Sequence, residues 1–228
     1  MPKKLTITEQ AVAQLASLWK PLCSEHRQMI ADHLVVRSYK RKETVYRSDE
    51  TPCQLFFMVS GKAIIKRDAP KQMRILRLLG ANDVFGYRAH FTSSAFYSST
   101  TCLEASIIAY LPFCIVDRLV REEPSIGLFF TKELSLLLAN SDTRSEVLTQ
   151  MPLRGRLAQT LLYLHDKYGS SNGELNVRIT REELGEMSNM NTSNAIRTLS
   201  QFTSEGLVET EGKVIRLLDK EGLRREYE

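Results

Sequence analysis

The sequence contains no run of about 18 apolar residues, the length that a helix needs to cross a bilayer. Residues 1–5 (MPKKL) also lack the apolar segment and cleavage site of a secretory signal. Glycine and proline are scarce, at 11 and 7 of 228 residues, which excludes collagen-like and low-complexity chains. We therefore expect a folded, cytoplasmic protein without a membrane segment.

Cysteine is also sparse. The four cysteines are 30, 49 and 12 residues apart: Cys23, Cys53, Cys102 and Cys114. This spacing matches neither a CxxC metal knuckle nor a dense disulfide framework, so we expect free thiols. Cys23 and His26 lie three residues apart in a predicted helix, but two ligands do not define a metal site. The sequence therefore predicts no metal site.

Common catalytic motifs are missing as well. The chain has no Gly-rich loop with a phosphate-binding lysine, no HExxH helix and no GxSxG turn. These patterns are typical of nucleotide hydrolases, zinc peptidases and serine hydrolases. Their absence predicts a protein that is not an enzyme.

Charge gives little guidance on its own. The formal net charge is +4, but residues 1–151 hold 20 lysines and arginines against 15 acidic residues, while residues 152–228 hold 11 against 12. A nucleic-acid-binding region usually shows a basic excess, so the near-neutral C-terminal part does not by itself indicate one. Local patterns must decide what this part does.

The first half of the chain predicts a β unit. A helical stretch over residues 7–33 is followed by short β-prone runs that alternate with Gly-, Pro-, Asn- and Asp-containing turns. The strands are predicted at 34–36, 44–46, 54–59, 62–65, 74–79 and 106–110. Strands at this close spacing favour an antiparallel sandwich or barrel of about 80 residues.

A long helix is predicted from residue 124. Its heptad positions are Phe130, Leu134, Leu137, Ser141, Arg144 and Leu148, the first half being more apolar than the second. A helix of about 25 residues is about 37 Å long, more than one small barrel can cover. We therefore favour a partner helix in a homodimer over a helix that packs only on its own sheet.

The C-terminal part shows a helix-turn-helix pattern. Helices are predicted at 153–168, 181–187 and 192–205, and strands at 175–179, 207–209 and 213–217. Thr180 with Glu183 has capping-box spacing, and Asn191 is a suitable N-cap for the second helix. Apolar packing between the two helices is predicted for Met187, Ala195, Ile196 and Leu199. Such a second helix can enter a DNA major groove.

Several polar residues around this turn are candidates for DNA contact. Arg197 is the strongest reader of a base, because its guanidinium group can bond guanine O6 and N7 together, although it could also bond phosphate. Asn194 can pair with adenine or contact the backbone, and Arg181 is predicted to bond phosphate. The full predicted DNA-binding set is Thr180, Arg181, Asn191, Thr192, Ser193, Asn194 and Arg197.

Four stretches of the chain are similar to one known family. Residues 154–162 (RGRLAQTLL) and 179–185 (ITREELG) resemble the helix-turn-helix region of the Crp/Fnr family of bacterial transcription regulators. Residues 59–63 (VSGKA) and 82–86 (NDVFG) resemble the cyclic-nucleotide-binding-type β-roll of that family. The resemblance covers nearly the whole chain.

The resemblance implies an α+β fold with three parts. Residues 1–123 would form a jelly-roll-like antiparallel β-roll with flanking helices, residues 124–151 a dimerisation helix, and residues 152–228 a winged helix-turn-helix. It implies a cytoplasmic homodimer that binds a double-stranded operator and works with RNA polymerase. An effector in the roll would reorient the two DNA-binding domains.

The residues of the implied effector pocket depart from the family pattern. In members that bind cyclic AMP, a glutamate follows the glycine that matches Gly86, and an Arg-Ser pair holds the phosphate; here these positions are Tyr87 and Tyr97-Ser98. A desolvated phosphate without a cation is costly, and only Arg88 lies nearby in sequence to replace it. We therefore expect an effector other than cyclic AMP.

Other features of the resemblance leave alternatives open. Ser141 and Asp142 match positions that contact the effector base in the family, or they are merely polar residues of the long helix. The cysteine spacing does not reproduce that of iron–sulfur members, whereas haem stays open because one axial ligand leaves little sequence pattern. A second hypothesis for function is a haem- or small-ligand-sensing module that acts mainly through a protein partner. Thr192 and Ser193 replace an arginine and a glutamate of the best-known members, so the operator should differ from theirs.

Overall fold

The structure is a computed structural model that describes residues 5–20, 22–67 and 74–227, with side chains outside the description over 142–150. Its contacts separate two compact units: Met1–Arg67 with Arg77–Leu138, and Asp68–Leu76 with Ala139–Glu228. Each unit is described by itself below. The long helix α5 (Pro124–Gln150) contributes residues to both.

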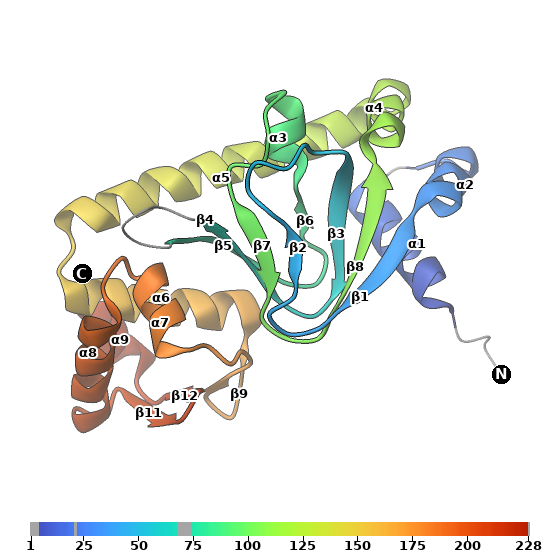
Figure 1. Cartoon of the computed structure of the whole chain (residues 1–228). Helices are drawn as coiled ribbons and strands as arrows, with labels where there is room; N and C mark the ends of the chain where they lie inside the picture. The colour runs from blue at the N-terminus through green and yellow to red at the C-terminus, as the bar shows by residue number, and fades with distance from the viewer. Residues whose placement is uncertain (1–4, 21, 68–73, 228) are drawn as a thin grey trace. The chain divides into compact units, whose positions relative to one another are not determined.

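The first unit is an antiparallel β-roll with helices (Figure 1). Its elements are α1 (Ile7–Leu18), α2 (Ser24–His33), β1 (Val35–Tyr39), β2 (Thr44–Tyr46), β3 (Gln54–Ser60), β4 (Ala63–Arg67), β5 (Arg74–Leu79), β6 (Val84–Phe85), α3 (Tyr87–Phe91), β7 (Ser99–Cys102), β8 (Ser106–Pro112), α4 (Phe113–Glu122) and the start of α5. The strands form two sheets, in the orders β1-β8-β3-β6 and β2-β7-β4-β5. The bounds of β2 and β5 are as predicted, whereas β6, β7, α3 and α4 were not expected from the sequence.

The opening helical stretch consists of two helices. The outer bounds of the helical stretch predicted over 7–33 are confirmed, but α1 ends at Leu18 and α2 begins at Ser24. Pro21 lies between them in the sequence, and proline lacks a backbone N–H and disfavours helical dihedrals in the residue before it. The Sγ atom of Cys23 then caps α2 by accepting a hydrogen bond from the His26 N–H at 3.4 Å.

β3 is buried on both of its faces. Side chains alternate along a strand, so neighbouring residues of β3 enter different apolar clusters. Phe56 and Met58 point into the roll interior, where they join one apolar cluster. Leu55, Phe57 and Val59 point the other way and join a second cluster beneath the helices. This explains why the strand is a continuous apolar run rather than an alternating one.

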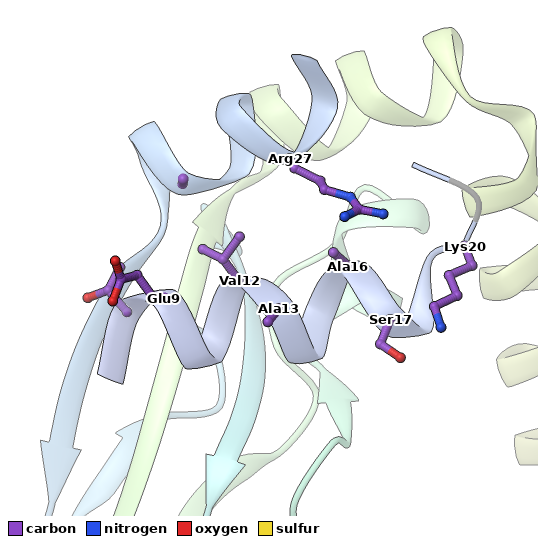
Figure 2. A pocket seen from close by; sticks show the side chains of 9 residues that line it. Glu9, Val12, Ala13, Ala16, Ser17, Lys20 and Arg27 are labelled. Atoms are coloured by element: carbon purple, nitrogen blue, oxygen red, sulfur yellow. The ribbon is translucent and has the colours of Figure 1, made fainter. Parts of the chain in front are cut away.

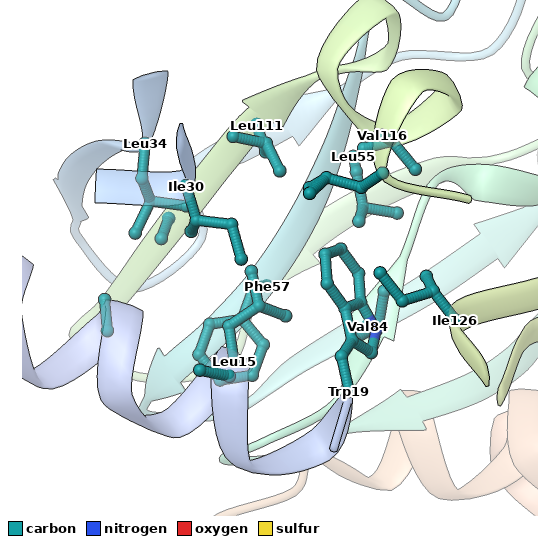
Figure 3. Packing of buried hydrophobic residues seen from close by; sticks show 14 of the residues in the cluster. Leu15, Trp19, Ile30, Leu34, Leu55, Phe57, Val84, Leu111, Val116 and Ile126 are labelled. Carbon is teal, nitrogen blue, oxygen red and sulfur yellow. The ribbon is translucent and has the colours of Figure 1, made fainter. Parts of the chain in front are cut away.

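The second cluster anchors α5 to the roll (Figure 3). Trp19 is 1% exposed, and its ring centroid lies 6.0 Å from that of Phe130 and 6.4 Å from that of Phe129. Phe130 is therefore buried in its own unit. The heptad pattern had placed it on a dimer seam, where it would have to be exposed. Leu137 also packs partly against this cluster.

α5 exposes several leucines, among them the predicted heptad residue Leu134. Leu134 and Leu138 are 38% and 64% exposed, and Leu128 and Leu136 are 54% and 61% exposed. Leu134 and Leu138 are four residues apart and lie on one side of the helix, which we call the leucine stripe. Of the predicted heptad positions in this unit, Leu134 is exposed, whereas Phe130 is buried among the large rings and Leu137 packs partly against them.

The second unit contains the predicted helix-turn-helix and a wing (Figure 1). Its elements after α5 are α6 (Leu153–Tyr168), β9 (Ser170–Ser171), β10 (Glu174–Leu175), α7 (Arg181–Met187), α8 (Thr192–Ser204), β11 (Val208–Glu211), β12 (Val214–Leu217) and α9 (Lys220–Arg225). The strands form one sheet in the order β11-β12-β10-β9. The bounds of α6 and α7 are those that the sequence predicts, and the predicted α+β fold is confirmed.

One arginine ties three elements of this unit together. Arg154 on α6 donates two hydrogen bonds to Glu205, at 3.0 and 2.6 Å, and two to Glu226, at 2.8 and 2.7 Å. Its guanidinium carbon also lies 4.9 Å from the ring centroid of Phe202. These bonds to Glu226 and Glu205 raise the pKa of Arg154, and the bond from Arg154 lowers the pKa of Glu205. Bidentate pairs of this kind hold the C-terminal end of α8 on α6.

Candidate nucleic-acid interface and roll interior

The two helices of the turn begin at capped residues. Thr180 Oγ1 accepts a hydrogen bond from the Glu183 N–H at 3.1 Å, and Glu183 Oε2 accepts one from the Thr180 N–H at 2.7 Å. Asn191 Oδ1 accepts from the Asn194 N–H at 2.7 Å at the start of α8. The predicted capping box and N-cap are thus confirmed, and they fix where both helices start.

The turn between α7 and α8 packs tightly. A Cβ on Gly185 would lie 2.9 Å from the carbonyl oxygen of Met190, so only glycine leaves room for this backbone. The Met190 N–H also donates to the Gly185 carbonyl at 2.9 Å. Ser188, at the end of α7, donates a buried hydrogen bond of 2.9 Å to Thr160 on α6. These contacts set the angle at which α8 leaves the domain.

α8 has one buried face and one exposed face. Ala195, Thr198, Leu199 and Phe202 are buried, as the prediction for Ala195 and Leu199 required. Ile196 is 47% exposed, so its predicted role in packing between the helices is wrong. Successive helical residues diverge by about 100°, and burial of Ala195 and Leu199 therefore turns Ile196 outward.

The predicted base-reading residues lie on or beside this exposed face. Thr192, Ser193 and Arg197 are exposed, and Asn194 is half-buried. The Arg197 Nη2 atom donates a hydrogen bond of 3.2 Å to Asn194 Oδ1. Asn194 therefore holds the guanidinium group of Arg197 before any ligand arrives, a role that sequence spacing did not predict.

Arg181 is less open than its predicted phosphate contact suggested. Its side chain is partly buried, and its Nη1 atom is enclosed without a hydrogen-bond partner among the described residues. Burial lowers the pKa of Arg181. An enclosed guanidinium nitrogen without an acceptor is costly.

The wing adds a cation that the predicted set did not include. β11 and β12 pair in register from Val208↔Leu217 to Glu211↔Val214, and Gly212 in the tight connection has a φ of +56°. Lys213 follows it and is exposed. The signal in the sequence was the turn pair Glu211-Gly212 between two β-prone runs, with a basic residue directly after it.

Aromatic rings fill the roll interior. The Tyr46 and Phe96 rings stack with their centroids 4.0 Å apart, and the Phe56 and Phe85 rings stack at 5.3 Å. Tyr46 also lies 5.3 Å from Phe56, and all four side chains are buried. Burial raises the pKa of Tyr46, so its hydroxyl stays neutral. A ligand entering this space would have to displace one or more of these rings.

The residues of the implied effector pocket do not gather around one space. Tyr87 is 1% exposed and belongs to the cluster beneath the helices, 5.2 Å from the ring of Phe130. Its burial raises its pKa. Tyr97 is 60% exposed, and the guanidinium carbon of Arg67 lies 4.0 Å from its ring centroid.

The remaining predicted pocket residues have varied settings. Gly86 has a φ of +86°, and a Cβ there would lie 2.8 Å from the Phe56 ring. Arg88 is exposed and Ser98 is half-buried. Ser141 is exposed on α5, and the side chain of Asp142 lies outside the described residues.

One ion-pair group joins the roll to α5 inside the first unit. Arg77 in β5 donates to the Val84 carbonyl at 3.3 Å and to Glu133 Oε2 at 3.4 Å. Its Nη2 atom is also 3.7 Å from Asp83 Oδ1. All three charged side chains are at least three-quarters buried, so the pairs hold the β5–β6 turn against the helix.

A groove of about 540 Å³ lies between α1 and α2 (Figure 2). It is lined by Thr8, Glu9, Val12, Ala13, Ala16, Ser17, Lys20, Arg27 and Ala31. None of these belongs to the predicted site. All four cysteines are free thiols, and of these only Cys102 is buried. Over the described ranges, no three His, Cys, Asp or Glu side chains are grouped as a metal site would need.

Two sequence models of known domains match the chain. A cyclic nucleotide-binding domain matches residues 36–123, and a Crp-like helix-turn-helix domain matches residues 155–226. The cAMP-activated global transcriptional regulator CRP of Haemophilus influenzae is 27% identical over 191 residues, which cover 80% of this chain and 84% of that one. The chain belongs to the Crp/Fnr family of transcription regulators.

Further comparisons agree. A CRP-like cAMP-activated global transcriptional regulator of Mycobacterium tuberculosis is 25% identical over 193 residues, 82% of this chain and 85% of that one. The solved structure of FixK2 from Bradyrhizobium japonicum has a TM-score of 0.78 at 16% identity and covers 86% of this chain and 98% of its own. The c-di-GMP responsive global regulator CLP of Xanthomonas campestris has a TM-score of 0.75 at 19% identity, covering 86% and 100%. The structures share the fold.

Membership of the family has direct consequences. The protein is a transcription regulator with a DNA-binding helix-turn-helix, so DNA is its partner, and a regulator of this kind implies RNA polymerase as another. The family consists of regulators and not of enzymes. In the described part of the chain, no helix combines the length and apolar character that crossing a membrane requires.

Proposed function

We propose that this Crp/Fnr member is a homodimer that reads a specific operator through the exposed face of α8, under the control of an effector other than cyclic AMP. The observation that carries the DNA part is Arg197, exposed on α8 and held by Asn194 at 3.2 Å. We also propose the division into a sensor at 1–123, a dimerisation helix at 124–151 and a DNA-binding domain at 152–228.

Replacing Arg197 by alanine should weaken the cognate operator by about 1–3 kcal/mol per half-site and relax the preference at one base pair. The operator is first selected from random duplexes with the full chain, and affinities are then measured by mobility shift at 50 and 200 mM salt. The matched control is Arg181→Ala, because Arg181 is proposed to contact phosphate. That variant should weaken all sequences alike and flatten the salt dependence.

Two results would count against this assignment. Equal sequence dependence in both variants would remove Arg197 as the base reader. If selected and random duplexes bind equally poorly at low salt, the alternative in which the chain acts mainly through a protein partner replaces base reading. The near-neutral charge of residues 152–228 is the feature that would favour that alternative.

The effector part of the proposal rests on the roll. Its interior holds four stacked or adjacent rings, from Tyr46, Phe56, Phe85 and Phe96. The buried Tyr87 lies in the other cluster, so the position that carries the ribose-binding glutamate in cyclic AMP-binding members supplies no acceptor there. Tyr97 stands where cyclic AMP-binding members have the arginine that holds the phosphate, and its side chain is exposed. This set of residues does not fit a cyclic nucleotide.

Cyclic AMP is therefore expected to bind weakly and without effect on operator affinity. Loss of one charge-assisted hydrogen bond costs about 1.5–3 kcal/mol, which alone weakens binding by more than about tenfold. Isothermal titration with cyclic AMP to millimolar concentration tests this, and the Haemophilus influenzae CRP relative is the positive control. Saturable micromolar binding that changes operator affinity would contradict the proposal.

The homodimer part rests on the leucine stripe of α5. Leu134 and Leu138 expose 38% and 64% of their surface on a helix of 27 residues, where water contact is unfavourable. A second copy related by a two-fold axis brings the same stripe against it, which buries both leucines in each copy. Operators with two half-sites match such a dimer.

A further inference from the structure

Ile196 is the largest apolar side chain on the exposed face of α8 among the described residues. It is 47% exposed, between the exposed Ser193 three residues before it and the exposed Ser200 four residues after it. All three lie on one side of the helix. Arg197 follows directly and is exposed as well.

This isoleucine contributes little to the helix or to the packing of its buried face. β-branched residues lose side-chain freedom in a helix and rank below alanine in helix propensity. The buried face of α8 is complete without it, since Ala195, Thr198, Leu199 and Phe202 form the contact with the domain. About half of the Ile196 side chain therefore faces solvent and makes no contact within the chain.

The neighbours of Ile196 leave it prominent. Ser193 and Ser200 are short, so the branched side chain of Ile196 stands above them on this face. The long side chain directly beside it is Arg197, whose guanidinium group is held by Asn194. The exposed face thus presents one apolar and one cationic projection next to each other.

We propose that Ile196 is a specificity residue that recognises the 5-methyl group of a thymine in the operator, close to the base that Arg197 reads. This inference rests on the proposed base reading by α8. Thymine alone among the four bases shows a methyl group in the major groove. Cytosine and adenine show an amino donor there, and an apolar side chain against that donor would leave it without an acceptor.

Deoxyuridine tests the inference because it differs from thymidine only by that methyl group. Each thymine of the selected operator half-site is replaced in turn, and the affinity of the full-length protein is measured. One position should lose about fourfold per half-site, the equivalent of burying one methyl-sized group, and about 15-fold when both half-sites are changed. At the other thymines, affinity should not change.

Two variants assign this loss to the side chain. Ile196→Ala should bind the thymine and deoxyuridine operators equally, and it should fold normally because the residue is exposed and alanine favours helices. The matched control is Leu218→Ala, another aliphatic residue of this unit, 55% exposed but outside α8, which should keep the full deoxyuridine loss.

Two results would overturn the inference. In the first, no thymine is sensitive to the loss of its methyl group. In the second, Ile196→Ala keeps the same sensitivity as the unchanged protein. Either result leaves the proposed base reading by Arg197 standing. Absence of any sequence preference in the unchanged protein would instead overturn base reading itself, and Ile196 with it.

Discussion

Replacing Leu138 by lysine should convert the protein from dimer to monomer. Leu138 is 64% exposed on the leucine stripe, and in the proposed dimer the lysine of each copy would enter an apolar interface. Desolvating an unpaired ammonium group costs several kcal/mol, and a total of about 4 kcal/mol already raises the dissociation constant about a thousandfold. Sedimentation equilibrium over a range of concentrations measures this directly, and operator affinity should fall with it because the half-sites are then bound separately.

The same helix supplies a matched control. Leu136 is 61% exposed, so Leu136→Lys makes an identical chemical change at a similar starting exposure. Two residues along a helix correspond to about 200°, which places Leu136 about 160° away from Leu138 around the axis. The control should remain a dimer. Dissociation of both variants, or of neither, would show that the stripe is not the dimer contact.

Features set by short-range chemistry could be predicted from the sequence. The starts of α7 and α8 follow from Thr180 with Glu183 and from Asn191, because a cap is formed within four residues along the chain. The strands predicted at 44–46 and 74–79 appear with those limits. In these places the local sequence pattern is sufficient to predict where the helix or strand begins.

Features set by packing between distant segments could not be predicted. Phe130 was expected on a dimer seam. Its ring instead packs against those of Trp19 and Tyr87, and Trp19 lies more than a hundred residues earlier in the sequence. Ile196 and Ala195 are both apolar neighbours, and only the docking of α8 against the rest of its domain decides which one turns inward. A periodic pattern shows that an apolar face exists, whereas its angle depends on the partners.

The predicted effector pocket also depends on packing between distant segments. The family motif placed Tyr87 in the effector pocket because it follows Gly86, yet the left-handed turn at Gly86, with a φ of +86°, is followed by a side chain that enters the other cluster. The filling of the roll interior was equally hidden, since Tyr46, Phe56, Phe85 and Phe96 are spread over 51 positions of the sequence. Neither the pocket nor its occupants form a local pattern.

Replacing Gly185 by valine should weaken operator binding strongly by displacing α8. A Cβ at this position would already lie 2.9 Å from the Met190 carbonyl oxygen and 3.4 Å from the backbone of Asn191 and Thr192, and backbone atoms cannot rotate away as a side chain can. Overpacking typically costs about 1–3 kcal/mol, and two further methyl groups against the turn place valine at the upper end. Because α8 must return to its original position to bind the operator, this cost lowers the binding free energy, a loss of roughly a hundredfold in affinity. Gly185→Ala should have a smaller effect on operator affinity, because alanine gains helix propensity while adding only the Cβ.

Gly127→Ala on α5 is the control, since its Cβ would meet Val120 at an ordinary 3.7 Å. Mobility shift and thermal unfolding should rank the three variants in that order, and operator binding by Gly185→Val at the affinity of the unchanged protein would show that this contact does not set the position of α8.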